Sequence, residues 1–371
     1  MSFLIISHVL HKKSKSKLFA YGPYVREMNL WLKHVDKVTI VAPHTKENIS
    51  SIDMAYKHNN IVLKKISAIQ FTSFQYVFKS VINLPIILFT IFKACKKADH
   101  IHLRCPGNIG LLGCCMQILF PRKIKTAKYA GNWDPKAHQP LSYRIQKWIL
   151  SNTVLTKNIK VLIYGEWEQQ SKNIVPFFTA TYKNSEIEIP IERSYNNALS
   201  FTFVGSLVNG KRPLFAVKII EELHKQGYEV ILDIFGDGVL KAEMENYISK
   251  NKLEAIVCLH GNQPKEQVKA ALQNAHFLIL PSKSEGWPKA ITEAMFYGTI
   301  PVSTSISCVP NMLDYGNRGI LIEPNIEAAV LKITEALNNK DLKKMSKLAS
   351  EWSQNYTLDY FESEIKKLLA D

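Results

Sequence analysis

Short, continuous apolar runs alternate with helix-like segments along the whole chain. In the first half these runs are residues 3–10, 37–43, 61–66, 100–106, 125–131 and 161–166. In the second half they are residues 200–207, 229–238, 255–261, 276–282, 299–305 and 319–324. Continuous rather than alternating hydrophobicity is typical of strands that are covered on both faces. Because helix-like segments such as 214–227 and 264–275 separate the runs, the pattern predicts an α/β protein with parallel sheets between helices.

Two such sets of runs in 371 residues predict two Rossmann-like domains. The polar stretch 181–198 is the expected boundary. It would divide the chain into an N-terminal acceptor domain, residues 1–190, and a C-terminal donor domain, residues 191–371. The last helix is a candidate to pack back on the first domain.

The most apolar run is Ser80–Cys95, whose clean apolar core is shorter than the roughly 20 residues that a membrane-spanning helix needs. We expect a core helix there, and a helix lying in a membrane interface is the alternative. Phe3–Leu10 is predicted to be the first buried strand rather than a signal peptide, because His8 interrupts it and the charged residues follow it.

Charge is distributed unevenly. Residues 1–200 hold 28 Lys and Arg against 11 Asp and Glu, whereas residues 201–371 hold 19 against 21. No zinc spacing, RNP-like run or basic leucine zipper accompanies this charge, which argues against nucleic-acid binding. The basic half instead predicts contact with an anionic membrane surface or a lipid-phosphate substrate, with a generally solvated basic surface as the alternative. Six cysteines without a CxxC pair favour a reducing cytosol.

The stretch Ser282–Gly298 places two glutamates, Glu285 and Glu293, around a predicted short helix. Pro288 suits the first helical position and Gly298 the residue after the last, so the helix is expected from about 288 to 297. The free N–H groups at its start favour an anion, whereas carboxylates accept hydrogen bonds from hydroxyls. A ligand with phosphate and hydroxyls, such as a nucleotide sugar, satisfies both. The alternative is one acid favoured by the helix dipole and one solvated glutamate.

Other candidate ligand-binding residues follow the strands of the predicted sheets. In open α/β sheets, ligands bind beyond the carboxyl ends of the strands, where glycines let a backbone approach closely. The first predicted strand is followed by a basic loop that ends at residues 21–24, and the segments after later strands are 205–212, 236–238 and 281–286. Lys211 and Arg212 supply charge for a diphosphate, although such a pair is more often solvated.

The second half resembles the retaining glycosyltransferases of family 4, which have the GT-B fold. The order and spacing of its motifs hold over roughly 120 residues, and Glu285 and Glu293 form an E-x7-E pair. The motifs that carry the resemblance are FVGSL (203–207) followed by Lys211, FGDG (235–238), LHGNQPKEQV (259–268) and LPSKSEGWPKAITEAMFYGTIPV (280–302).

The resemblance implies two Rossmann-like domains facing each other across a cleft that binds a UDP- or GDP-sugar. It implies that Glu285 contacts the sugar hydroxyls, that Glu293 binds the ribose, and that Lys211 and the amides of 286–290 hold the diphosphate. An arginine usual in such proteins is replaced by Ser206, and backbone near Asn262 and Gln263 would hold the base. The expected donor-binding residues are Gly22, Gly205, Lys211, Arg212, Gly236, Asn262, Gly286, Trp287, Pro288, Lys289 and Glu293.

The first half matches this family less well. Many relatives carry a histidine after a strand about a third of the way along the chain, where this sequence has KYAGNWDPKAHQP (128–140). Asn132 and Asp134 are therefore catalytic candidates beside Glu285, since an acid could orient or deprotonate an acceptor hydroxyl. The alternative for Asp134 is a turn or helix cap. Arg104 and His138 are candidates for acceptor binding.

The sequence thus predicts a retaining glycosyltransferase that uses a nucleotide sugar and needs no metal or other cofactor. Its acceptor is expected to be a lipid-linked saccharide in capsule, O-antigen or exopolysaccharide synthesis, at the cytoplasmic face of the inner membrane. One alternative is a nucleotide-sugar 2-epimerase of the same fold. Another is a non-catalytic nucleotide-sugar-binding subunit.

Overall fold

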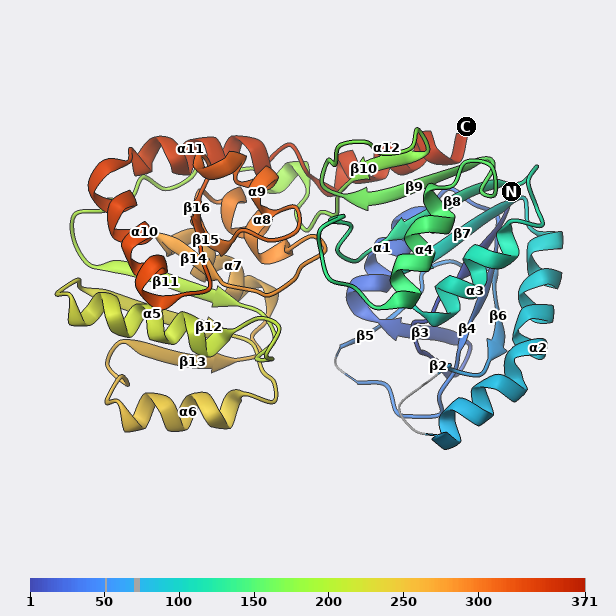
Figure 1. Cartoon of the computed structure of the whole chain (residues 1–371), viewed down its shortest axis with the longest axis horizontal. Coiled ribbons are helices and arrows are strands. Elements are labelled where there is room, and N and C mark those ends of the chain that lie inside the picture. The colour runs from blue at the N-terminus through green and yellow to red at the C-terminus, as the bar shows by residue number, and fades with distance from the viewer. Residues whose placement is uncertain (51, 70–73, 371) are drawn as a thin grey trace. The chain divides into compact units, whose positions relative to one another are not determined.

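The computed structural model describes residues 1–50, 52–69 and 74–370, which form two compact units (Figure 1). Unit 1 comprises Met1–Phe178 and Phe361–Asp371, and unit 2 comprises Thr179–Tyr360. This division comes earlier than the boundary expected after residue 190, because the intervening residues bond within unit 2. The Thr181 hydroxyl donates to Glu293, and the Asn184 N–H donates to Asp359. Helix α12 (Leu358–Ala370) begins in unit 2 and continues into unit 1.

Unit 1 is built on a seven-stranded parallel sheet in the order β10-β9-β8-β7-β1-β4-β6. The order places β1 beside β7, so the chain reverses its direction of winding at this pair of strands. The carboxyl ends of β1 and β7 therefore mark a topological switch point, where ligands bind in open α/β sheets. The strands are β1 (Ser2–Ile6), β4 (Lys37–Pro43), β6 (Ile61–Ile66), β7 (His100–Cys105), β8 (Ile124–Tyr129), β9 (Ile159–Tyr164) and β10 (Ile174–Phe177).

A second, antiparallel sheet of unit 1 occupies the region that the sequence predicted to be a basic loop. It consists of β2 (His11–Ser14), β3 (Lys17–Tyr21) and β5 (Asp53–Ala55), with β3 in the middle. The loop prediction was wrong because the lysines of this hairpin hide its strands. They do not alternate with apolar residues in the way that would identify a strand from the sequence. Lys12 instead donates to Asp53, which fixes the hairpin to β5.

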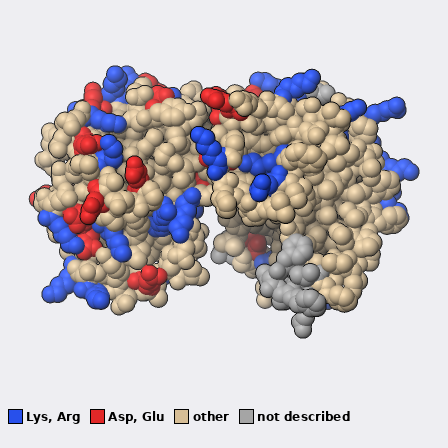
Figure 2. All heavy atoms as spheres, viewed as in Figure 1, with Lys and Arg blue, Asp and Glu red and all other residues tan. Residues whose placement is uncertain are grey.

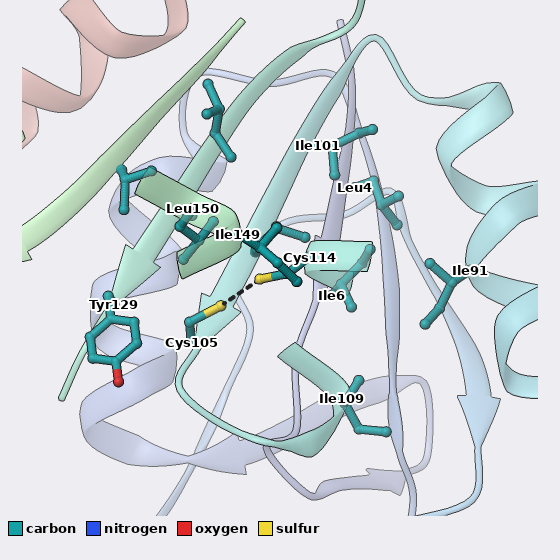
Figure 3. Close-up of a cluster of buried hydrophobic side chains, with 14 of the residues drawn as sticks. Leu4, Ile6, Ile91, Ile101, Cys105, Ile109, Cys114, Tyr129, Ile149 and Leu150 are labelled. Carbon is teal, nitrogen blue, oxygen red and sulfur yellow. Dashed lines mark hydrogen bonds between the residues drawn. The ribbon is translucent and has the colours of Figure 1, made fainter. Parts of the chain in front are cut away.

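Helices cover the sheet of unit 1 and enclose its core. They are α1 (Gly22–Leu32), α2 (Phe74–Lys97), α3 (Asn108–Gln117) and α4 (Leu141–Ser151). Figure 3 shows Leu4 and Ile6 of β1 packed with Ile91 of α2 and Cys114 of α3, whose sulfur lies 3.7 Å from that of Cys105. Helix α2 therefore contributes one face to the core, as predicted for residues 80–95. Among the described residues, no helix has both the length and the hydropathy needed to cross a membrane.

Unit 2 has a six-stranded parallel sheet in the order β13-β12-β11-β14-β15-β16. Its switch point lies between β11 and β14, which pair directly. The strands are β11 (Leu199–Val204), β12 (Val230–Phe235), β13 (Val257–Gly261), β14 (Phe277–Leu280), β15 (Ile300–Thr304) and β16 (Ile320–Ile322). The helices are η1 (Asn184–Glu186), α5 (Pro213–Lys225), α6 (Lys241–Lys250), α7 (Lys265–Asn274), α8 (Lys289–Phe296), α9 (Val309–Met312), η2 (Asp314–Gly316), α10 (Ile326–Asn339) and α11 (Leu342–Ser353).

Candidate functional site

Backbone hydrogen bonds tie together three strand ends of unit 2. The N–H of Gly205 donates to the carbonyl of Phe235 at 3.0 Å, and the N–H of Gly236 donates to that of Gly261 at 2.8 Å. Gly236 has a φ of 145°, and a Cβ at this position would lie 1.9 Å from the carbonyl oxygen of Gly205. Only glycine fits such an approach. Gly205 and Gly236, both predicted from the sequence, therefore allow the ends of β11 and β12 to approach each other closely.

Lys211 and Glu285 meet at this switch point. The N–H of Lys283 donates to the carbonyl of Gly210 at 2.8 Å, which holds the loop after β14 against the loop after β11. This bond brings the Lys211 ammonium to 2.5 Å from a carboxylate oxygen of Glu285, whose side chain is only 10% exposed. The N–H of Glu285 in turn donates to the hydroxyl of Ser307 at 3.2 Å. Two residues singled out in the sequence thus form one ion pair.

Helix α8 begins directly after Gly286, Trp287 and Pro288. Pro288 is the residue before the first turn rather than the first helical residue, and Gly298 follows the helix with a φ of 73°. Glu293 lies within α8, where one oxygen accepts a hydrogen bond from the Thr181 hydroxyl at 2.7 Å. Burial raises the pKa of Tyr182 above its ordinary value, and the negative charge of Glu293 raises it further. The helix start and both acids of the E-x7-E pair therefore belong to one unit.

The indole of Trp287 anchors the loop that carries Glu285. Its ring stacks on Trp352 at a centroid distance of 6.1 Å and meets the edge of Tyr356 at 5.6 Å. These contacts fix Trp287 against the end of α11 and its following turn.

The remaining predicted donor residues of unit 2 also lie close to helix starts or strand ends. Arg212 is the residue before α5 and has a left-handed backbone, with a φ of 51°. Asn262 is exposed and follows β13 directly. Lys289 is the half-buried first residue of α8. Neighbouring Gln263 donates to the carbonyl of His260 at 2.6 Å, which stabilises the turn after β13.

In unit 1, Gly22 has a packing role. Its N–H donates to the carbonyl of Ile52 at 2.7 Å, and a Cβ at this position would lie 2.9 Å from the same oxygen. Gly22 is buried at the start of α1. The N–H of Gly22 therefore already has a protein acceptor. Because Gly22 has no side chain, the backbone of Ile52 can pack directly against it.

Asn132, Asp134 and His138 follow β8, as the sequence predicted. The Asn132 side chain accepts from the N–H of Asp134 at 2.9 Å, and the Asp134 side chain accepts from the N–H of Lys136 at 2.8 Å. These are the turn-stabilising bonds typical of Asn and Asp. His138 is exposed. The ammonium of Lys147 lies within 3.2 Å of the Asp134 carbonyl, and burial lowers the pKa of Lys147 to about 8.

Arg104 follows a different pattern, because it has a buried partner that the sequence did not reveal. Its guanidinium donates to Glu27 of α1 at 2.8 Å, and both side chains are largely buried. The same guanidinium lies 5.4 Å from the ring centre of Tyr24. Partial burial lowers the pKa of His8, and the positive charge of Arg104 lowers it further. His8 follows β1, and Arg104 lies near the carboxyl end of the neighbouring strand β7, at the switch point of unit 1.

Residues 184–355 match the model of the family described as Glycosyl transferases group 1. That region contains every strand of unit 2 and the Lys211–Glu285 pair.

Two curated relatives and one solved structure illustrate the similarity. Amylovoran biosynthesis glycosyltransferase AmsK of Erwinia amylovora is 29% identical over 142 residues, covering 37% of this chain and 35% of that protein. A Campylobacter jejuni enzyme, GalNAc-alpha-(1->4)-GalNAc-alpha-(1->3)-diNAcBac-PP-undecaprenol alpha-1,4-N-acetyl-D-galactosaminyltransferase, is 26% identical over 190 residues, covering 50% of this chain and 51% of that protein. Anabaena Alr3699/HepE, solved in complex with UDP, superposes with a TM-score of 0.68 at 13% identity, covering 100% of this chain and 99% of that chain.

The fold of the chain is GT-B, with two Rossmann-like units built on parallel sheets. The matched family and both of these curated relatives are described as glycosyltransferases. The chain spans about half the length of the curated relatives that it matches first.

Three residues of the candidate sites were missed from the sequence. Thr181 and Ser307 bond to the two acids of the E-x7-E pair, and Glu27 neutralises Arg104. Each lies 22 or more positions from its partner. Single hydroxyls and acids at such separations carry no local pattern. His8 could have been found, because it is a polar residue within the first predicted apolar run.

One group in the described part of the chain has the composition of a metal site. Potential ligand atoms of Asp233, Cys258 and His260 lie within 4.8 Å of one another on β12 and β13. The Nε2 of His260 lies 2.6 Å from Asp233, however, so that nitrogen already has a partner. The His260 ring also stacks on Phe235 at 4.6 Å.

Proposed function

We propose that the protein is a retaining glycosyltransferase that moves a sugar from a nucleoside diphosphate sugar to an acceptor hydroxyl. The observation that carries the proposal is the Lys211–Glu285 pair, on the loops beside the start of α8, with Glu293 further along that helix. A cation and a helix N-terminus suit a diphosphate, and carboxylates suit hydroxyls. A nucleotide sugar combines both groups in one molecule.

In the proposed mechanism, Lys211 and the N–H groups of residues 286–290 bind the diphosphate. Bond breaking moves negative charge onto this leaving group, and the fixed positive charge and helix dipole stabilise it there. We therefore propose that the reaction needs no metal. The Lys211–Glu285 bond has to loosen when a donor binds, because the ammonium then shares its charge with the diphosphate.

The two acids hold the rest of the donor. Glu285 would accept from hydroxyls of the transferred sugar and Glu293 from those of the ribose. As the bond from the anomeric carbon to the diphosphate breaks, the acceptor oxygen forms a bond to that carbon on the same face. The acceptor's proton passes to the departing diphosphate oxygen. The configuration of the sugar is retained because attack and departure share one face.

We also propose that the acceptor is a lipid-linked saccharide of a bacterial surface polysaccharide, bound at the cytoplasmic face of the inner membrane. The Campylobacter relative is named for a PP-undecaprenol substrate, and the Erwinia relative is named for amylovoran biosynthesis. The excess of Lys and Arg in residues 1–200 suits a phosphate-bearing acceptor near anionic lipid. Arg104, Asn132, Asp134 and His138 stay candidates for acceptor contacts in unit 1.

A thermal-shift screen of UDP, GDP, ADP and their sugars against the wild type and Glu293→Ala tests the donor site. A ligand that binds only the folded state raises the melting temperature. We expect one nucleotide to stabilise the wild type and to lose most of this effect in the variant. If no nucleotide stabilises the wild type at millimolar concentration, the donor-site proposal is wrong.

The fate of the sugar separates transfer from the two alternatives. With the identified donor and a lipid-linked acceptor, NMR of the product should show the anomeric configuration of the donor. Inversion would contradict the retaining mechanism. Conversion of the donor to its 2-epimer would indicate an epimerase, and tight donor binding without transfer or hydrolysis would indicate a non-catalytic subunit.

A further inference from the structure

Helix α2 exposes an apolar face along most of its length. Its inner face packs in the core of unit 1 through Ile87, Ile91 and Cys95. Its outer face carries large apolar side chains at intervals of three or four residues, which places them in one row. The members of this row, with their exposed fractions, are Phe78 (64%), Val81 (58%), Ile82 (57%), Ile86 (65%), Phe89 (58%) and Phe92 (36%).

This row differs from the outer face of helix α11. A helix on the surface of a soluble protein normally turns polar side chains to the solvent. Helix α11 does so with Lys343, Lys347 and Glu351, which are all well exposed. Helix α2 has no Asp or Glu at all between residues 74 and 97. Contiguous apolar surface of this kind marks a site of interaction.

The charges beside the row identify the partner as anionic. Lys93, Lys96 and Lys97 are exposed at the C-terminal end of α2. The Lys93 ammonium lies 4.2 Å from the ring centre of Phe89, so its stem follows the apolar surface while its charge stays at the edge. Figure 2 shows few acidic side chains on the visible face of unit 1, in contrast to unit 2. An apolar row flanked by lysines is typical of a helix in a membrane interface.

We propose that α2 docks the protein on an anionic lipid bilayer. The helix lies parallel to the membrane, with the row from Phe78 to Phe92 among the acyl chains and Lys93, Lys96 and Lys97 at the lipid phosphates. Figure 1 shows α2 at the periphery of unit 1. This inference rests on the proposed membrane location and names the surface that provides it.

Flotation of the full-length protein with vesicles tests the proposal without any sugar donor. Vesicles of phosphatidylcholine alone and of phosphatidylcholine with phosphatidylglycerol are compared. We expect binding to the anionic vesicles, and a loss of at least tenfold in Ile82→Ser/Ile86→Ser/Phe89→Ser. The matched control is Ile189→Ser/Val239→Ser/Leu331→Ser, which removes exposed apolar side chains from unit 2 and should bind like the wild type.

The lysines are tested separately. Replacing Lys93, Lys96 and Lys97 by Gln should weaken binding to anionic vesicles by about fivefold for each charge removed, and should reduce its salt dependence. The same exchange at Lys343, Lys344 and Lys347 of α11 should have little effect. Equal losses in both triple variants would show that net charge, and not α2, directs binding, and would overturn the proposal.

Two further outcomes are decisive. If the row is covered by a second copy of this chain, light scattering will show a dimer that the α2 triple-serine variant dissolves, while vesicle binding is unchanged. That result would refute membrane docking through α2. The nucleotide thermal shift, measured on the same variants, should be unaffected. If the wild type shows no nucleotide thermal shift, the donor-site proposal is contradicted, while the flotation result still tests membrane docking.

Discussion

The ammonium of Lys211 lies 2.5 Å from a carboxylate oxygen of Glu285, although 74 positions separate the two residues. Lys211 follows the first strand of the unit 2 sheet and Glu285 the fourth, and these two strands are neighbours at the switch point. The topology, rather than any local pattern, therefore creates the pair. Its opposite charges hold each other in the position where the diphosphate and the sugar are proposed to bind.

Substitutions at the two ends of this pair should have different effects on binding. Lys211→Met should weaken the binding of the nucleoside diphosphate by roughly tenfold to a hundredfold, because a charge-assisted hydrogen bond is lost. Glu285→Gln should retain or improve this binding, since Lys211 is released, while transfer is lost. Calorimetry with the diphosphate and a transfer assay measure both. The control is Glu221→Gln, which breaks a similar bond to Lys225 of 2.6 Å on α5; an equal effect there would contradict the assignment.

Gly236→Ala should destabilise unit 2 by roughly 2 kcal/mol or more, because a new Cβ collides with the Gly205 carbonyl and the backbone has positive φ. Urea denaturation measures this free energy of unfolding. Gly210→Ala is the matched control, since a Cβ at Gly210 meets no atom within 4 Å. Similar stability of the two variants would show that the strand ends adjust more freely than the contacts indicate.

Acid should destabilise unit 1 through buried His100. Its Nε2 lies 2.9 Å from the Thr126 hydroxyl, and burial lowers its pKa from 6.5 to about 4. Below pH 6.5 the unfolded chain gains a proton that the folded chain does not, so the free energy of unfolding falls until the pH reaches the folded pKa. Between about pH 7.5 and about pH 5, this histidine alone should remove about 2 kcal/mol.

The measurement is urea unfolding of the wild type and His100→Gln over this range of pH. The variant should lose less stability on acidification than the wild type. His138→Gln, which replaces an exposed histidine of the same unit, should retain the pH dependence of the wild type. If His100→Gln also retains it, another group is responsible.

Phe361 should be the residue that fixes helix α12 to unit 1. It is buried and packs on Phe177 and Phe178 at centroid distances of 5.4 and 5.6 Å. The Lys128 ammonium, which donates to the Phe178 carbonyl at 2.8 Å, lies 4.4 Å from the ring centre of Phe177 and 5.8 Å from that of Phe361. Phe361→Ala should cost about 3–4 kcal/mol of stability, measured by urea denaturation. Tyr360→Ala, at the exposed neighbouring position, should cost less than half as much; equal losses would contradict the docking role.

The strands of both parallel sheets, except β10, could be predicted because most of them are short, continuous apolar runs. The site of unit 2 was predictable for a related reason. Its residues follow those strands, and Glu285, Pro288 and Glu293 stand within nine positions of one another. Strand β10 (Ile174–Phe177) was not predicted. The β2–β3 hairpin was missed because lysines occupy it.

Unit 1 was harder to predict because its polar residues are paired across long separations. The sequence shows Arg104 as a free cation after a strand, whereas Glu27 neutralises it from 77 positions away. The sequence offered Asn132 and Asp134 as catalytic candidates, with a turn or helix cap as the alternative for Asp134. In the structure, both side chains make hydrogen bonds that stabilise a turn. The exposure of α2 could not be predicted either, because an apolar helix in a core has the same composition as one at a surface.

Unit 2 is continuous in sequence, from residue 179 to residue 360, whereas unit 1 needs residues from both sides of it. The order of synthesis therefore differs from the order of the units. During translation, unit 2 receives all of its residues before unit 1 does, although unit 1 begins the chain. The β8–β10 edge of unit 1 has to wait for Phe361 to cover Phe177 and Phe178. A chain that ends before residue 361 therefore contains every residue that unit 2 needs up to Tyr360, but lacks the aromatic side chain that packs on Phe177 and Phe178 in unit 1.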